Sequence, residues 1–222
     1  MTHEHGHQAE LTCTGITFGY PGQETFLNGI DFHLDSGERL GLVGPNGSGK
    51  STLLLCLTGL LKASGRRVLD GEELPPGKPD GAHIGLVFQN AEDMLFMPTV
   101  VEDVAFGPQN LGLSPEAARA AAENQLDRLG IAHLADANGL KLSGGQQRLA
   151  ALAAVLSMEP PVLLLDEPTA NLDEASRARL LDLLTELPGS LVMATHDRAA
   201  VKEVCSRVLV MEEGKILETR ED

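Results

Sequence analysis

The chain has 222 residues, 42% of them hydrophobic, and a formal net charge of −15. This composition is typical of a globular protein with one large domain or a core with a subdomain. The acidic charge argues against a sequence-independent nucleic-acid binder and against direct docking on anionic lipid. No apolar run approaches the ~20 residues that span a bilayer, so we expect no direct membrane insertion. The separated residues Cys13, Cys56 and Cys205 predict reduced thiols of a cytoplasmic protein.

The N-terminal segment 1–9 carries His3, His5 and His7. These histidines fall on one side of an extended chain and could bind a borderline divalent metal. We expect the segment to be a flexible, solvated tail.

Residues 10–18 and 30–34 alternate apolar and polar side chains, which predicts half-buried antiparallel strands. The turn between them carries Tyr20, the one tyrosine of the chain. An aromatic ring at this place could stack on an adenine ring or could be an ordinary packing residue.

A phosphate-loop pattern follows the next predicted strand, Arg39–Val43, and precedes a predicted helix at 52–61. Its glycines let the backbone amides turn towards phosphates, and the helix N-terminus adds a partial positive charge. Lys50 can reach the β- and γ-phosphates, and the Ser51 hydroxyl can ligate Mg²⁺. The loop consists of Gly44, Pro45, Asn46, Gly47, Ser48, Gly49, Lys50 and Ser51.

Two further strands, 66–70 and 82–88, are predicted before Gln89. Residues 90–113 have weak periodicity and are expected to be irregular. Their methionines and phenylalanines predict either a packing surface for another protein or an internal loop packed on its own domain. A helix is then expected from Ser114-Pro115, an N-cap with a first-turn proline, to Gly130.

Ser143 is expected to cap a helix whose N-terminus is again rich in glycine and suited to an anion. The apolar run 162–165 predicts a strand of a parallel sheet, buried on both faces. At its carboxyl end, where ligands gather, Asp166 can hold Mg²⁺ and Glu167 can polarise an attacking water.

The remaining chain predicts a helix through about Leu187 and a buried strand at 191–195, which ends at His196. A pair of strands, 207–211 and 215–219, closes the sequence around a tight turn.

The motifs stand in one order: the phosphate loop, Gln89, Leu142-Ser143-Gly144-Gly145-Gln146, the strand ending in Asp166-Glu167, and His196. Together they resemble the nucleotide-binding subunit of ATP-binding-cassette transporters, over nearly the whole chain. The resemblance implies an α/β fold: a phosphate-loop NTPase core with a mixed, mainly parallel sheet. It also implies an N-terminal antiparallel β-subdomain and an α-helical signature subdomain at about 90–158, within one ATPase domain at 10–222.

The resemblance gives each matching position a role, with ATP and Mg²⁺ as cofactors. The nucleotide would be held by Tyr20 at the adenine, by Gly44 to Thr52 at the phosphates, and by the signature residues Ser143, Gly144, Gly145 and Gln146. Mg²⁺ would be held by Ser51, Gln89 and Asp166. Catalysis would depend on Glu167, His196, Lys50 and Gln89, and Asp173 would be the acid of the D-loop.

The same resemblance implies that two copies pair head to tail, as a homodimer or a pseudo-symmetric heterodimer, with each ATP between the phosphate loop of one copy and the signature of the other. Residues 94–106 would pass the motion to transmembrane transporter subunits. The protein would then sit peripherally on the cytoplasmic face of the cell membrane.

Residues 87–96 and 98–108 resemble more narrowly the ATPases of energy-coupling-factor importers, especially the cobalt and nickel branch. The tail histidines fit a metal cargo but do not establish it. The sequence differs from the longer members of that family because it ends at Asp222. We therefore expect no C-terminal dimerisation or regulatory domain.

Three alternatives remain beside this interpretation. The cargo could be a vitamin or another small molecule. A soluble cassette ATPase acting on DNA or ribosomes is disfavoured by the acidic charge and by the short span from Gln89 to Ser143, which leaves no room for a coiled-coil arm. A non-catalytic nucleotide-dependent scaffold is disfavoured by the presence of Glu167 and His196. The sequence leaves open the identity of the membrane partners.

Overall fold

The computed structural model describes residues 9–22 and 25–221, so His3, His5 and His7 lie outside the described residues. Its strands are β1 (Leu11–Phe18), β2 (Leu27–Leu34), β3 (Arg39–Val43), β4 (Ser64–Leu69), β5 (Glu72–Glu73), β6 (Ile84–Val87), β7 (Val162–Asp166), β8 (Ser190–Thr195), β9 (Arg207–Glu212) and β10 (Lys215–Glu221). Its α-helices are α1 (Lys50–Thr58), α2 (Val100–Asn110), α3 (Pro115–Arg128), α4 (Gly144–Leu156), α5 (Glu174–Glu186) and α6 (Arg198–Val204). Short 3₁₀ turns are η1 (Ala91–Met94), η2 (Ala132–Leu134) and η3 (Gly139–Lys141).

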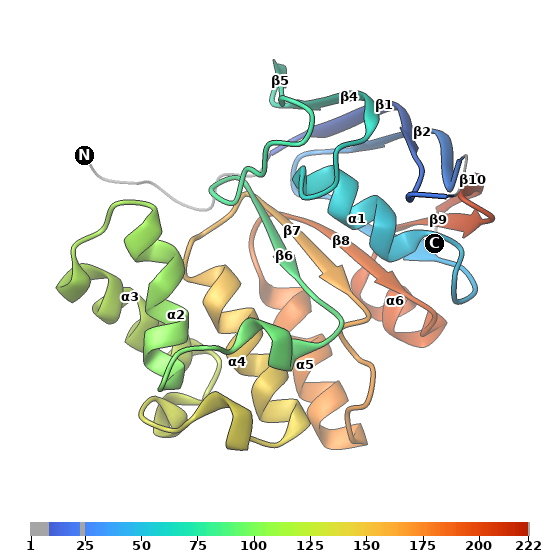
Figure 1. The fold of residues 1–222 in the computed structure, drawn as a ribbon. Helices are drawn as coiled ribbons and strands as arrows, with labels where there is room; N and C mark the ends of the chain where they lie inside the picture. The colour runs from blue at the N-terminus through green and yellow to red at the C-terminus, as the bar shows by residue number, and fades with distance from the viewer. Residues whose placement is uncertain (1–8, 23–24, 222) are drawn as a thin grey trace.

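The strands form two sheets (Figure 1). The larger sheet has the order β10-β9-β3-β8-β7-β6, and its strands pair in parallel except for β9 with β10. The smaller sheet, β2-β1-β4-β5, is antiparallel throughout. The predicted mixed, mainly parallel sheet and the predicted antiparallel N-terminal strands are therefore confirmed.

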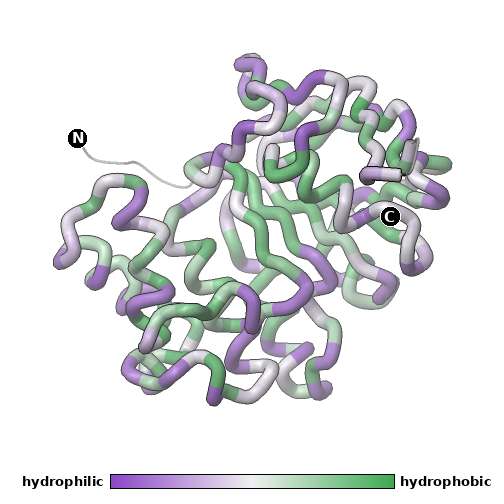
Figure 2. The backbone as a smooth tube through the Cα atoms, in the orientation of Figure 1, coloured by the Kyte–Doolittle hydropathy of each residue, from purple (hydrophilic) through white to green (hydrophobic). Residues whose placement is uncertain are grey.

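Two hydrophobic clusters fill the space on the two faces of the larger sheet. One joins α1 to the antiparallel sheet, and it includes Leu53 and Leu57 from the helix. The other cluster lies on the opposite face and includes residues of helices α2, α3, α4, α5 and α6. Figure 2 shows hydrophobic residues concentrated along the central strands, which both clusters cover. Because β7 is buried at all of its positions, its continuous apolar run behaves as the sequence predicts.

Helix α2 corrects the expectation that 90–113 is irregular. It begins with a capping box in which the Glu102 carboxylate accepts from the Thr99 amide at 3.0 Å. Pro108 lies inside the helix, so the Val104 carbonyl lacks its usual helical donor. The Ser157 hydroxyl donates to that carbonyl at 2.8 Å from the end of α4. A distant residue thus compensates for the proline, and the pattern around Pro108 alone does not reveal the helix.

Other elements differ in extent from the prediction. α1 begins at Lys50 rather than at 52, and it ends at Thr58 because Gly59 adopts the left-handed conformation (φ 82°). The strand expected at 82–88 is shortened to β6. The sequence analysis missed α6, which follows Asp197 directly.

Candidate functional site

The phosphate loop between β3 and α1 is tied down by backbone contacts. The Ser48 amide donates to the Pro45 carbonyl (3.2 Å), and the Ser48 carbonyl accepts from the Gly214 amide (2.9 Å). Lys50 is 6% exposed, and its ammonium donates to the carbonyls of Gly44 (2.9 Å) and Pro45 (3.1 Å). Because these carbonyls are neutral, they do not compensate the positive charge of the ammonium, which is available to an anion beside the loop.

Two glycines of the loop stand where a side chain does not fit. A Cβ at Gly44 would collide with the Met211 carbonyl oxygen. Gly49 has a φ of +108°, and a Cβ there would lie 2.9 Å from Leu27 and from Met211 side-chain atoms. Helix α1 has no side-chain N-cap and no acid in its first turn, so its first amides point out without a side-chain acceptor.

A pocket of about 310 Å³ opens beside this loop. It brings Gln89, which follows β6, and Glu167, which follows β7, next to the loop residues. These residues are far apart in the sequence, and parallel strands deliver them to one edge of the sheet. The pocket is lined by Phe26, Asn46, Gly47, Gly49, Lys50, Ser51, Thr52, Gln89 and Glu167.

Buried oxygen atoms at this site lack partners within the described chain. Asp166 is 7% exposed, and its Oδ1 has no hydrogen-bond partner there, nor does the Ser48 hydroxyl. Burial raises the pKa of Asp166, and a hydrogen bond from Ser51 opposes that rise. A hydroxyl and a carboxylate side by side fit Mg²⁺ shared with substrate phosphates. Residues 9–22 and 25–221 contain no cluster of three or more His, Cys, Asp or Glu that could hold a metal ion by protein ligands alone.

Glu167 is held by the end of the neighbouring strand β8. It is 6% exposed, and its carboxylate accepts from the Thr195 hydroxyl at 2.8 Å. His196 Nδ1 lies 3.0 Å from the same carboxylate. Glu167 also has a φ of +45°, an unusual backbone conformation for a residue with a side chain. The structure therefore places Glu167 and His196 in contact, at the edge of the phosphate-loop pocket.

Tyr20 lies against the first turn of α1. Its hydroxyl is 2.9 Å from Thr52 Oγ1, and its ring packs edge-on against Phe18 (centroids 4.9 Å apart) and Phe26 (5.5 Å). Phe26, rather than Tyr20, is the aromatic residue among those that line the pocket. The sequence analysis missed Phe26 because its position at a strand start is typical of a core residue.

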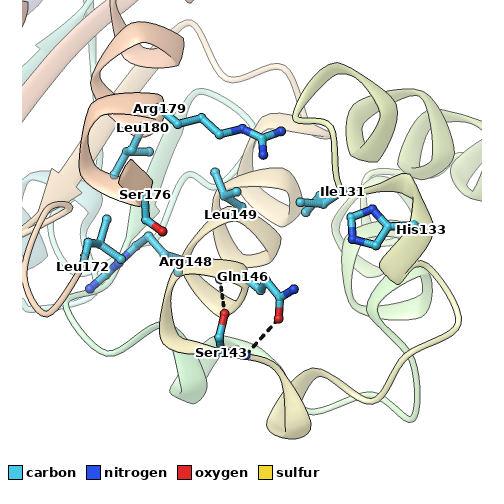
Figure 3. Close-up of a pocket in the computed structure, with 11 residues that line it drawn as sticks. Ile131, His133, Ser143, Gln146, Arg148, Leu149, Leu172, Ser176, Arg179 and Leu180 are labelled. Atoms are coloured by element: carbon cyan, nitrogen blue, oxygen red, sulfur yellow. Dashed lines mark hydrogen bonds between the residues drawn. The ribbon is translucent and has the colours of Figure 1, made fainter. Parts of the chain in front are cut away.

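The signature residues form a separate site at the N-terminus of α4. Ser143 is the N-cap, as predicted: its hydroxyl accepts from the Gln146 amide, and the Gln146 side chain accepts from the Ser143 amide at 3.0 Å (Figure 3). Ser143, Gly145 and Gln146 line a second pocket of about 310 Å³, together with Arg179 and His133. None of Ser143, Gly144, Gly145 and Gln146 lines the phosphate-loop pocket, so one described chain does not unite the two motifs.

Asp173 caps α5 and accepts from the Ser176 amide (2.9 Å) and hydroxyl (2.7 Å), which lowers the pKa of Asp173. Further along α5, the Arg177 Nε donates to Asp197 at 2.9 Å. Asp197 follows His196 and caps α6. An aspartate directly before a helical segment is an N-cap signal for α6, whereas the ion pair with Arg177 depends on how α5 and α6 pack.

Arg148 is a further residue that the sequence analysis missed. It lies on α4, is 5% exposed, and donates to the carbonyls of Phe88 (2.8 Å) and Gln89 (2.6 Å). A lone arginine among alanines and leucines on a buried helix face is the signal that could have identified it.

An apolar groove of about 460 Å³ lies near α2 and the end of β6. Phe96 (61% exposed) and Phe106 (42%) lie at this groove and pack edge-on, with centroids 5.1 Å apart. Leu95, which lies within the expected coupling segment 94–106, is 3% exposed and belongs to the core. The exposed apolar surface of this segment therefore excludes Leu95. Within the described part of the chain, no helix is both long and apolar enough to cross a membrane.

The comparisons with known proteins identify proteins that are described as ABC transporter components or as an import ATP-binding protein. A family model described as "ABC transporter" matches residues 27–170. An ABC transporter ATP-binding protein of Gloeobacter violaceus is 48% identical over 212 residues, covering 93% of this chain and 87% of that protein. The cobalt import ATP-binding protein of Rhodobacter capsulatus is 44% identical over 215 residues, covering 93% and 77%. The solved structure of cbiO1 from Clostridium perfringens, described as part of an ABC transporter complex, has a TM-score of 0.83 and 36% identity, covering 95% of this chain and 88% of that one.

Proposed function

The chain belongs to the ABC transporter family as an ATP-hydrolysing subunit, and from that membership we propose that it energises an importer of the energy-coupling-factor type, with cobalt or nickel ions as cargo. The convergence of Lys50, Gln89 and Glu167 on one pocket beside an unobstructed helix N-terminus carries the catalytic part of the proposal. It combines an anion site with a carboxylate that can accept a proton, which is what phosphoanhydride hydrolysis needs.

The phosphates of ATP are proposed to lie on the amides of residues 44–52 and on the Lys50 ammonium. Tyr20, whose ring packs against the pocket residue Phe26, is proposed to contact the adenine ring. Glu167 accepts the proton of the attacking water, and His196 fixes the Glu167 carboxylate and contributes to the γ-phosphate site.

Mg²⁺ would be held by Ser51, Asp166 and Gln89, and when bound it supplies charge neutralisation at the phosphates. The orphaned Asp166 Oδ1 supports this assignment, because a buried carboxylate oxygen without a donor is a ready ligand for a cation. Removing the cation is expected to weaken ATP binding without unfolding the chain.

A second copy is proposed to supply the signature. Ser143 and the phosphate-loop pocket are separate within one chain, yet Ser143 caps a helix N-terminus suited to an anion. In a two-fold dimer each nucleotide would lie between one phosphate loop and the partner's signature, so that binding ATP closes the pair and hydrolysis releases it. This arrangement would hold for a homodimer or a pseudo-symmetric heterodimer.

The apolar groove with Phe96 and Phe106 is proposed to receive a cytoplasmic segment of a transmembrane subunit. Exposed phenylalanines around a groove are a common form of protein contact surface. The protein would then be peripheral to the membrane, on its cytoplasmic face. The position of α2 supports this assignment, since the helix connects the groove to the signature helix α4 through packed side chains.

The cargo rests on resemblance alone. One relative is named as a cobalt import protein, whereas others are named only as ABC transporter ATP-binding proteins. The test is to isolate the tagged chain with its membrane partners, reconstitute the complex in vesicles, and measure ATP-dependent uptake of Co²⁺, Ni²⁺ and vitamins. Uptake of a vitamin without either ion would overturn the cargo but leave the ATPase assignment. Failure of any membrane protein to co-purify with the tagged chain would instead indicate a soluble, non-transport enzyme.

A further inference from the structure

Arg148 connects the signature helix to the backbone beside the phosphate-loop pocket. Its guanidinium donates to the carbonyls of Phe88 (2.8 Å) and Gln89 (2.6 Å). Both residues lie just beyond β6, where no further strand pairing with β7 is formed. In Figure 3 the Arg148 side chain runs from α4 towards the side where Leu172 lies, away from His133.

Burying the charged guanidinium of Arg148 costs free energy, so the bonds that offset this cost matter for the fold. Arg148 is 5% exposed, and burial lowers the pKa of its guanidinium, while the charges of Asp166 and Glu167 oppose that shift. A buried cation is stabilised by acceptors for its N–H donors, and the two carbonyls accept from both terminal nitrogens of the guanidinium. The same bonds satisfy carbonyls that the strand leaves unpaired. Arg148 and the chain after β6 therefore depend on each other.

The contact fixes the main chain of a residue whose side chain enters the pocket. Gln89 lines the phosphate-loop pocket together with Lys50 and Glu167. Within the described residues the Gln89 side chain forms no hydrogen bond that would orient it, whereas its carbonyl accepts from Arg148. The position of the Gln89 side chain at the nucleotide thus depends on α4.

We propose that Arg148 is a positioning residue that sets Gln89 at the γ-phosphate end of the nucleotide site and ties it to the signature of the same chain. This inference rests on the proposed function. Ser143 caps the N-terminus of α4, and Arg148 lies one turn further along the same helix, so hydrogen bonds of one helix connect the two residues. A displacement of the signature by the partner's nucleotide is therefore transmitted to Gln89, so each nucleotide site responds to the other.

A double-mutant cycle on the purified chain tests this inference. The variants are Arg148→Met, which keeps most of the side-chain length but removes the donors, Gln89→Ala, and the pair together. We expect Arg148→Met alone to lower kcat by about 10- to 100-fold with ATP affinity retained, because misplacing a positioned group has costs of that order. In the Gln89→Ala background it should lower kcat no further.

A structural role alone would give a different result. Loss of stability or of active protein would lower kcat by the same factor in both backgrounds, and that outcome overturns the inference. So does a wild-type kcat for Arg148→Met. If Arg148→Met does not fold, Arg148→Lys enters the same cycle, since it keeps the charge but reaches the carbonyls with one donor group. The Lys variant is expected to lie between wild type and Met.

Arg67→Met provides the matched control. Arg67 is also 5% exposed and donates to two carbonyls, those of Leu57 and Pro75 (both 2.6 Å), but it does not contact the chain beside Gln89. Any effect of this variant on kcat should be the same factor in both backgrounds. If Gln89→Ala retains wild-type kcat, the inference fails, whereas an inactive Glu167→Gln protein in the same series would leave the proposed ATPase function intact.

Discussion

His196 Nδ1 lies 3.0 Å from both carboxylate oxygens of Glu167. The carboxylate also accepts from the Thr195 hydroxyl, so residues at the end of β8 hold a side chain that follows β7. Glu167 has a φ of +45° in this arrangement, a strained conformation that the surrounding contacts maintain. Strain and burial at an acid beside a phosphate pocket are typical of a catalytic residue.

Glu167→Gln is expected to remove hydrolysis but not ATP binding. The amide keeps the shape of the side chain and still accepts from Thr195, but it cannot take a proton from water. Loss of a general base typically lowers the rate by ~10²–10⁴-fold. Phosphate release assays and calorimetry with ATP and Mg²⁺ measure the two quantities. Hydrolysis at the wild-type rate would exclude Glu167 from the catalytic role.

The same variant is expected to accumulate an ATP-dependent dimer in size-exclusion chromatography, because the nucleotide that joins the copies is not cleaved. Ser143→Arg in the Glu167→Gln background should remove that dimer, since it places bulk and charge at the N-terminus of α4. A Glu167→Gln protein that is inactive yet monomeric with saturating ATP would count against the proposed pairing in the absence of membrane subunits.

Lys50→Ala is expected to weaken ATP binding by about 10- to 100-fold, the scale of one charge-assisted hydrogen bond to a phosphate. The ammonium is buried beside the loop carbonyls of Gly44 and Pro45, so its loss leaves the phosphates without a side-chain cation there. Calorimetry measures the affinity, with exposed Lys62→Ala as a control. Equal affinities for Lys50→Ala and wild type would refute the phosphate-loop assignment.

Phe96→Ala combined with Phe106→Ala is expected to weaken capture of the membrane partner by about tenfold or more, since exposed aromatic anchors dominate interfaces. ATP affinity of the isolated chain should not change. Leu217→Ala, which removes an exposed leucine on β10, is the control. Leu95→Asp is unsuitable for this purpose, because it buries a charge in the core and is expected to unfold the chain. Unchanged capture and transport would show that the groove is not the contact surface.

Asp103→Asn is expected to make the stability of the chain less sensitive to pH. Asp103 is 4% exposed, and burial raises its pKa although the amides of Phe96 and Met97 donate to Oδ1. A raised pKa means that the folded state holds the proton more tightly, so this group makes the wild type less stable as pH rises through the folded pKa. Asparagine has no carboxyl group to titrate, so the variant does not lose this part of the stability as pH rises.

Urea denaturation of both proteins at about pH 4, within the ordinary carboxyl range, and at about pH 7, above that range, measures the effect. The free energy of unfolding of the variant, relative to wild type, should be higher at the upper pH. Exposed Asp182→Asn should show no such trend. A relative stability that falls with rising pH would contradict the assignment of a raised pKa to Asp103.

The sequence alone determined the parts of this protein that depend on neighbours along the chain. The phosphate loop at 44–51 is readable because its glycines, lysine and serine act at fixed spacing between one strand and one helix. The caps at Ser114 and Ser143 are readable because an N-cap bonds to an amide within its own helix turn. The buried strand at 162–165 follows from its unbroken apolar run, and its acids follow from their position at its end.

Only the tertiary structure decided which distant residues meet. Helix α2 survives Pro108 because Ser157, far along the chain, satisfies the Val104 carbonyl. Arg148 reaches the Gln89 carbonyl because α4 packs beside the end of β6. No sequence spacing encodes such contacts, since they depend on how side chains fill the space between elements. The separation of Ser143 from the phosphate-loop pocket has the same origin, because the packing of α4 sets the distance between two motifs that the sequence shows only in order.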